Sequence, residues 1–190
     1  DGGCIVNLMS SIGERFGRPR PADYPLLAAL APARLARARR VALVVIDGLG
    51  AQLLEHFARL PDGSHLAGCN AGTMTSVYPP TTASAITTFM SGQAPQQHAL
   101  TGWFMHFRKL GAVTAVLPFM PRFGGTTLSA AGVQPGALID VSSFAAQIEA
   151  QAAALLPREL VDSDYSSLLG AGSSRAGYQG LNELDRKSVV

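Results

Sequence analysis

The feature that most constrains this chain is the segment VALVVIDGLG at residues 41–50. Six consecutive apolar residues, most of them β-branched, lead into an acid and two glycines. An unbroken apolar run of this length predicts a strand that is buried on both faces, as in a parallel sheet. Gly48 and Gly50 allow a sharp turn after the strand, and residues 51–60 predict the helix that follows.

Asp47 stands at the point where this strand ends. In an open α/β sheet the ligand site lies beyond the carboxyl ends of the strands. We therefore predict an α/β fold with a mainly parallel sheet, and we place Asp47 at its functional edge. The alternative is that Asp47 only caps the next helix.

Length and composition fit one domain over residues 1–190. The chain is 47% hydrophobic and only 15% charged, so it can bury a sizeable core and does not resemble a disordered chain. A net charge of +2 is too small to indicate a nucleic-acid partner. Four arginines form a basic cluster, which we interpret as the solvated end of a helix: Arg34, Arg37, Arg39 and Arg40.

The sequence gives little information about the cellular compartment. It contains no run of about 18 apolar residues that would span a membrane and no visible signal peptide. This favours the cytoplasm, although the chain starts at Asp1 rather than at a methionine. Cys4 and Cys69 are far apart in the sequence, and we expect both to be buried free thiols.

A second informative segment is VYPPTTASAITTFMSG at residues 77–92. Its two adjacent prolines stop any strand, and residues 83–91 predict a helix that ends at Gly92. We expect this helix to bury the apolar residues that recur at helical spacing, namely Ile86, Phe89 and Met90.

Thr81 and Thr82 lie where this helix begins. A hydroxyl at this position faces unpaired backbone N–H groups and the positive end of the helix dipole, and these groups bind phosphate oxygens. A threonine nucleophile also needs a base or a metal. Asp47 could hold a divalent cation against the threonine oxygen. The alternative is that one of the threonines is an ordinary N-cap.

The secondary structure of other segments can also be predicted, but these segments contain no candidate catalytic residue. Residues 103–108 and 112–117 predict a hairpin or two neighbouring strands, and the Gly- and Pro-rich stretch 118–134 predicts a lid, a binding loop or a disordered link. The remaining expectations are a short apolar segment at 4–9, short helical pieces at 26–30 and 35–38 split by Pro32, a helix at 144–156, a strand at 159–161, and a polar end from 169 that adds little to the core.

Among the four histidines, only His98 is expected near the site, because it lies in the loop after the threonine helix. His56 is expected on the surface, His65 in a turn, and His106 packed within a strand. Gly48-Leu49-Gly50 is a weak dinucleotide motif because its third glycine is replaced by Leu53. Neither a P-loop nor the CxPSR motif of sulfatases is present.

Together these segments resemble the alkaline phosphatase superfamily, and most closely its type I phosphodiesterase and nucleotide pyrophosphatase branch. The resemblance rests on VVIDGLG, SVYPPTTASAITTFMSG and QHALTGW, at residues 44–50, 76–92 and 97–103, with a similar lead-in IVNLMSSI at 5–12. It covers most of residues 4–120 and continues more weakly to about 182. The fold it implies is an alkaline-phosphatase-like three-layer sandwich.

The resemblance also implies a two-zinc hydrolase that acts on small-molecule phosphate esters, with no nucleic-acid or membrane partner. Asp47 would be a zinc ligand, and Thr82 would bind zinc and attack phosphorus. The resulting phosphoenzyme would be hydrolysed by zinc-bound hydroxide. Thr81, His98 and the backbone N–H of Ala83 would contact the substrate.

The sequence departs from the family pattern at two points. Ala85 replaces an asparagine that contacts a phosphoryl oxygen in the pyrophosphatase branch. The family's later zinc ligands, a D-x-x-x-H pattern, an Asp-His pair and a distant His, have no counterpart here, since no histidine follows His106. Three aspartates without informative spacing could be recruited instead: Asp140, Asp162 and Asp164.

We therefore expect the N-terminal portion of a longer catalytic domain, incomplete at its C-terminus. The competing hypothesis is a non-catalytic remnant that binds phosphate or a nucleotide at the Thr82 helix terminus without turnover.

Overall fold

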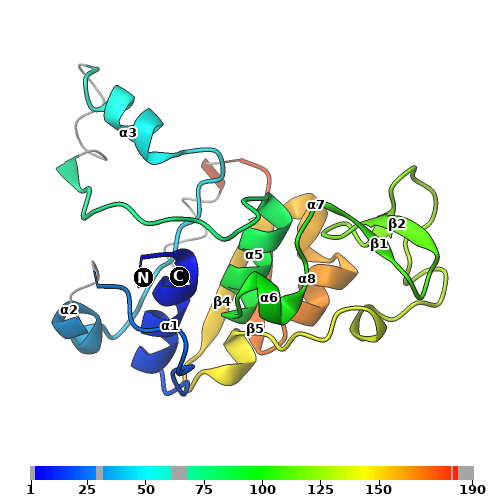
Figure 1. Cartoon of the computed structure of the whole chain (residues 1–190), viewed down its shortest axis with the longest axis horizontal. Coiled ribbons are helices and arrows are strands. Elements are labelled where there is room, and N and C mark those ends of the chain that lie inside the picture. Colours follow the sequence, from blue (N-terminus) through cyan, green and yellow to red (C-terminus); the bar gives the residue numbers. More distant parts are fainter. Residues whose placement is uncertain (1–2, 29–31, 61–67, 181, 184–190) are drawn as a thin grey trace.

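The computed structural model describes residues 3–28, 32–60, 68–180 and 182–183. It shows a mixed α/β chain with two small sheets (Figure 1). Its helices are α1 (Ile5–Arg15), α2 (Pro32–Arg37), α3 (Ala51–Phe57), α5 (Thr82–Ser91), α6 (Pro95–His98), α7 (Arg158–Val161) and α8 (Asp164–Leu169). Its strands are β1 (Phe104–Phe107), β2 (Ala112–Ala115), β3 (Met120–Pro121), β4 (Ala152–Pro157) and β5 (Ser173–Tyr178), and two short 3-10 turns cover Pro135–Ala137 and Ala145–Gln147.

The predicted hairpin is confirmed. Strands β1 and β2 pair antiparallel with Phe104 opposite Ala115, and β3 adds to β2 through Thr114 and Pro121. This three-stranded sheet projects to one side of the molecule (Figure 1). β3 lies inside the stretch 118–134, which is therefore not wholly irregular.

The second sheet is parallel but has only two strands. β4 pairs with β5 from Ala152 opposite Ser173 to Pro157 opposite Tyr178. The expectation of one mainly parallel sheet is therefore not confirmed, because the described part of the chain also contains the separate three-stranded antiparallel sheet.

The predicted strand at residues 41–46 is not formed. The segment belongs to neither sheet, and four of its apolar residues are exposed: Leu43 (41%), Val44 (70%), Val45 (44%) and Ile46 (55%). An apolar run shows that a segment is suited to burial, but a strand also needs a neighbour to take up its backbone hydrogen bonds. In this fold β4 and β5 pair with each other instead.

The helices predicted beside the two motifs are confirmed with altered bounds. α3 ends at Phe57 rather than residue 60, and it buries no residue. α5 begins at Thr82 and ends at Gly92, whose φ of +67° marks a left-handed C-cap.

The buried face of α5 differs from the prediction. It consists of small and hydroxyl-bearing residues, namely Ala83, Ser84, Thr87, Thr88 and Ser91. Ile86, Phe89 and Met90 are only partly buried, because they pack at the margins of the apolar clusters.

The expectations for the C-terminal third are mostly wrong. The alanine-rich stretch 144–156 forms a 3-10 turn and then strand β4, and residues 159–161 lie in helix α7. Alanine favours helices only weakly, and pairing with β5 overrides that preference. The predicted polar end supplies both β5 and the buried residue Leu169, which is 1% exposed.

The expectations for the N-terminal third are partly correct. The apolar segment at 4–9 opens the longer helix α1, and Pro32 begins α2 rather than splitting two helical pieces. Residues 26–28 are not helical, and 29–30 lie outside the described residues. Arg37, Arg39 and Arg40 are exposed as predicted. Both cysteines are free, but Cys69 is exposed and Cys4 is only partly buried.

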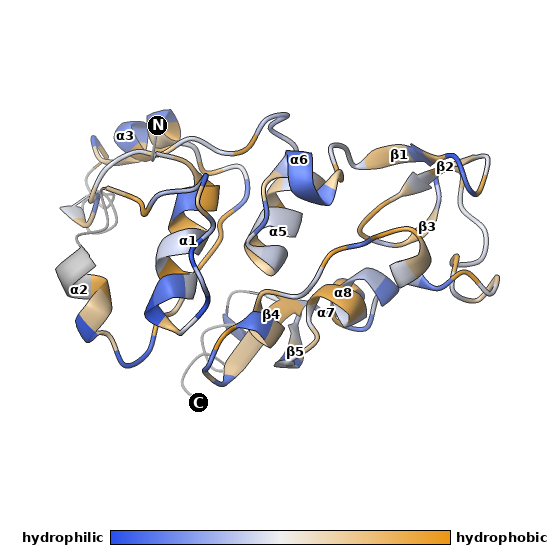
Figure 2. Cartoon of the chain, turned by 60° about the horizontal axis from the view of Figure 1, so that its bottom comes forward, coloured by the Kyte–Doolittle hydropathy of each residue, from blue (hydrophilic) through white to orange (hydrophobic). Residues whose placement is uncertain are grey.

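Helix α5 occupies the centre of the molecule, packed between α1 and α8, while α3 and the β1–β2 hairpin project at opposite ends (Figures 1 and 2). The largest apolar cluster joins Ala83 of α5 to Phe119, Tyr165 and Leu169. Two smaller clusters surround α1. None of the described helices is long and apolar enough to cross a membrane.

Arg18 fastens the C-terminal end of α5 to the C-terminal part of the chain. Its side chain is buried, donates to the carbonyl of Gly92 at 3.3 Å and to Oε1 of Gln147 at 3.1 Å, and lies 5.3 Å from the ring centroid of Phe144. Burial lowers the pKa of the Arg18 guanidinium. The side chains of Arg18 and Phe144 thus pack closely against Gly92.

We predict that Gly92→Ala destabilises the fold more than Gly111→Ala does. Both glycines have a positive φ, of +67° and +63°, which costs an alanine about 1 kcal/mol. A Cβ on Gly92 would also overlap the Arg18 guanidinium and lie 2.8 Å from the Phe144 ring, whereas one on Gly111 meets nothing within 4 Å. We expect about 2 kcal/mol of additional loss at Gly92 in urea unfolding. Equal losses for the two variants would contradict this packing.

Candidate functional site

The structure brings together the two residues that the sequence motifs single out. The hydroxyl Oγ1 of Thr82 donates a hydrogen bond to Oδ2 of Asp47 at 3.0 Å, across a sequence separation of 35 positions. Asp47 follows the extended segment 41–46, and Thr82 is the first residue of α5. The chain turns at Gly48, which has a φ of +79°.

The geometry excludes helix capping as the role of Asp47, whereas Thr81 does occupy the N-cap position that the alternative assigns to one of the threonines. Gly50, not Asp47, occupies the N-cap position of α3. Thr81 occupies the N-cap position of α5 with extended backbone angles, but its side chain makes no capping hydrogen bond. The hydroxyl of Thr82 points to the carboxylate of a distant segment, so neither residue is used only to end or begin a helix.

The pair is accessible to a solute. Asp47 is exposed, while Thr81 and Thr82 are half-buried. The pair therefore combines a carboxylate, a hydroxyl and the positive end of a ten-residue helix at the molecular surface. Ala83, predicted as a backbone contact for substrate, is 0% exposed and faces the core.

His98 is buried beside α5, where its ring lies against Thr88 and the backbone of Ser84. Its Nε2 lies 3.3 Å from Oγ1 of Thr88, and its Nδ1 accepts a hydrogen bond from the backbone N–H of Leu100 at 3.0 Å. The ring is 4% exposed, and desolvation lowers the pKa of His98 to about 4. An accepting Nδ1 places the remaining ring proton on Nε2, so the ring is neutral at pH 7. Its predicted role as a substrate contact stays a prediction.

The other histidines follow the sequence expectations only in part. His56 is exposed on α3, as predicted. His106 is exposed on β1, so the prediction of a packed histidine is wrong. His65 lies outside the described residues.

The comparison with known families fits this geometry. The model of the type I phosphodiesterase / nucleotide pyrophosphatase family matches residues 41–149, a range that contains both Asp47 and Thr82. The chain belongs to the type I phosphodiesterase / nucleotide pyrophosphatase family. Its members are phosphoric ester hydrolases that act on small-molecule phosphate esters. No curated protein and no solved structure matches the chain.

Resemblance to the phosphodiesterase family implies that two zinc ions bind at this site. The side chains that could donate to a metal ion test that expectation. Asp47 and Thr82 give two oxygen donors on one site, whereas a zinc ion takes three or four protein ligands. Within the ranges that the structure describes, no group of three His, Cys, Asp or Glu side chains could hold a metal ion. The described residues alone therefore do not fit a complete zinc centre.

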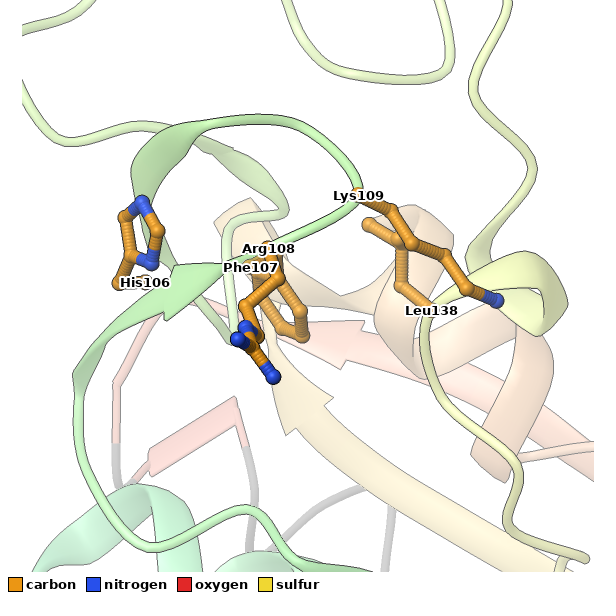
Figure 3. A pocket seen from close by; sticks show the side chains of 5 residues that line it. All are labelled: His106, Phe107, Arg108, Lys109 and Leu138. Carbon is orange, nitrogen blue, oxygen red and sulfur yellow. The ribbon is translucent and has the colours of Figure 1, made fainter.

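The phosphodiesterase-family chain also has a surface hollow that its sequence motifs do not predict. It has a volume of about 240 Å³ and is lined by His106, Phe107, Arg108, Lys109 and Leu138 (Figure 3). Lys109 Nζ donates to the carbonyl of Ala137 at 2.9 Å. Neither Asp47 nor Thr82 lines this hollow, so it is separate from the candidate site.

Sequence reasoning missed the residues that hold α5 in place. The hydroxyl of Tyr165, on α8, lies 2.6 Å from Oγ1 of Thr87, and the two residues are 78 positions apart in the sequence. No local motif marks either residue, because their contact depends on how α8 packs on α5.

We predict that Asp47→Ala leaves the free energy of unfolding within about 0.5 kcal/mol of wild type, because Asp47 is exposed and makes a single solvent-accessible hydrogen bond. Urea unfolding of the two proteins measures this difference. A loss above about 1.5 kcal/mol would show that Asp47 is part of the structural framework rather than of a binding site.

We predict that His98 makes the fold less stable in acid. The unfolded histidine takes up a proton near pH 6.5, and the folded one only near pH 4. The unfolded state therefore binds more protons between these values, and stability falls as the pH drops from about 7 to 4, by on the order of 3 kcal/mol. His98→Gln should flatten this part of the pH profile in urea unfolding. An unchanged acid slope would contradict a buried, neutral His98.

Proposed function

We propose that Thr82 is the nucleophile of a phosphoester hydrolase and that Asp47 acts on the same hydroxyl. The observation that carries the proposal is the 3.0 Å hydrogen bond from Thr82 Oγ1 to Asp47 Oδ2 at the start of α5. It joins an acidic acceptor to the hydroxyl of the first residue of the helix, at the positive end of α5. Membership of a phosphoric ester hydrolase family supports this use of the pair.

The reaction proceeds in two displacements. In the first, Thr82 Oγ1 attacks phosphorus, its proton passes toward the adjacent Asp47 carboxylate, and the bond from phosphorus to the leaving oxygen breaks. In the second, water attacks the phosphothreonine, the bond from Thr82 to phosphorus breaks, and the Thr82 oxygen takes its proton back from Asp47. The proton that the water loses passes to solvent, and solvent protonates the oxygen released in the first displacement. Negative charge that develops on the phosphoryl oxygens is stabilised by the positive end of α5.

The proposal includes a divalent metal, and zinc is the ion that the resemblance implies. Asp47 and Thr82 are the donors that this chain would contribute to it. Because these are too few for a zinc centre, we propose that the chain is the N-terminal portion of a catalytic domain whose other donors lie beyond the described residues.

The second candidate function is binding without turnover. Ala85 stands where the pyrophosphatase branch has an asparagine, and no histidine follows His106. These two features favour a remnant that retains phosphate or a nucleotide at the first turn of α5. Nucleotide that co-purifies with the chain and is not hydrolysed would support this alternative.

We predict that Thr82→Ala lowers kcat for bis(4-nitrophenyl) phosphate at least 1000-fold in the presence of zinc, because it removes the attacking oxygen. The assay is run on the 190-residue chain and on the full-length gene product that contains it. Thr82→Ser keeps a hydroxyl and should retain measurable hydrolysis.

Thr126→Ala is the matched control, because Thr126 is an exposed threonine outside the candidate site, and it should behave as wild type. Hydrolysis that survives Thr82→Ala would overturn the assignment of the nucleophile. Nucleotide binding without hydrolysis by any of these proteins would favour the second candidate function.

A further inference from the structure

We infer that Tyr165 is a positioning residue that fixes the first turn of α5, and with it Thr82, by acting through Thr87. The juxtaposition is direct: the Tyr165 hydroxyl lies 2.6 Å from Thr87 Oγ1, and Thr87 Oγ1 lies 2.7 Å from the carbonyl oxygen of Ala83. Ala83 follows Thr82 in the chain. The catalytic part of this inference rests on the proposed function of Thr82.

The direction of the two hydrogen bonds follows from the chemistry of the groups. A carbonyl oxygen has no proton, so Thr87 must donate its single hydroxyl proton to Ala83. Tyr165 must then donate to Thr87 Oγ1. The result is a one-way chain from α8 to the second residue of α5, and each bond makes the next donor stronger.

This chain ends on the peptide group that joins Ala83 to Ser84, directly after Thr82. The carbonyl of Ala83 and the N–H of Ser84 lie on one rigid peptide plane and point in opposite directions. The Ser84 N–H is among the donors that the first helical turn leaves without an intrahelical acceptor. A hydroxyl that fixes the Ala83 carbonyl therefore also fixes the direction of this N–H group.

Burial makes these contacts specific. Tyr165 is 2% exposed and Thr87 is 0% exposed, so water does not compete for either hydroxyl. Burial also raises the pKa of Tyr165, which keeps the phenol in its donating form at neutral pH. Tyr165 and Ala83 belong to the same apolar cluster, which ties the orientation of the ring to the packing of the first turn.

The neighbouring hydroxyl of α5 shows what Tyr165 adds. Ser91 Oγ donates to the carbonyl of Thr87 at 2.6 Å, one turn further along the same face. This bond lies within α5, whereas the Tyr165 bond joins α5 to α8. Tyr165 therefore links the position of α8 to that of the buried hydroxyl-bearing face of α5.

The test compares Tyr165→Phe, Thr87→Val and the double variant, with Tyr24→Phe as a matched control. The Tyr24 hydroxyl bonds Nε2 of Gln96, which lies on α6. Amide hydrogen exchange of residues 85–88 is measured first, because it needs no turnover and because the N–H groups of α5 bond within the helix only from Ala85 onward. We expect at least tenfold faster exchange there in Tyr165→Phe, with much smaller changes in β4 and β5, and no change in the control.

The kinetic test asks for a kcat effect. With bis(4-nitrophenyl) phosphate and zinc, Tyr165→Phe should lower kcat about tenfold and change KM less than twofold. In the Thr87→Val background the same substitution should have no further effect, because the two residues act through one chain.

Exchange that rises equally in α5, β4 and β5 would show that Tyr165 only stabilises the whole fold, and would overturn the inference. Unchanged exchange would overturn it as well. If exchange responds as expected but hydrolysis survives Thr82→Ala, the positioning of the first turn stands and the proposed nucleophile fails. If Thr82→Ala abolishes hydrolysis but Tyr165→Phe changes neither exchange nor kcat, the positioning inference alone fails.

Discussion

The structure depends on how α5 buries hydroxyl groups. A helix face made of Ser84, Thr87, Thr88 and Ser91 contributes little apolar surface, and each buried hydroxyl costs free energy unless it finds a partner. Thr87 and Ser91 bond carbonyls of their own helix, while Tyr165 and His98 approach from outside. The contacts from Tyr165 and His98 fix the rotation of the helix, and with it the direction of Thr82, while Ser84 Oγ is buried without a hydrogen-bond partner among the described residues.

The two halves of the candidate site are therefore supported very differently. Thr82 starts a helix that is packed on both sides by α1 and α8. Asp47 lies at the end of an exposed extended segment, and the helix that follows it buries no residue. The Thr82 side is placed by the core, and the Asp47 side reaches it through one surface hydrogen bond.

The sequence was informative where a local rule decides the outcome. The turn at Asp47, the helix that begins beside Thr82, its end at Gly92 and the β1–β2 hairpin all depend on nearby glycines, prolines or alternation, and all are found. The pairing of Asp47 with Thr82 was expected from the chemistry of the two motifs.

The sequence did not predict structure that depends on a partner distant in the chain. Residues 41–46 have the composition of a buried strand but no adjacent strand in this fold. The alanine-rich stretch becomes β4 because β5 lies beside it. Tyr165 carries no signal at all, since its role exists only once α8 packs on α5.

The separation of 35 positions between Asp47 and Thr82 has a thermodynamic consequence. Closing a flexible loop of that length costs about 3 kcal/mol, whereas one exposed hydrogen bond contributes about 1 kcal/mol. The bond cannot hold the two segments together by itself. A ligand that contacted both residues would hold the two segments together. Its apparent affinity would be lowered by the free energy needed to close the loop. Occupancy of the site and order in the surrounding segments are therefore one equilibrium.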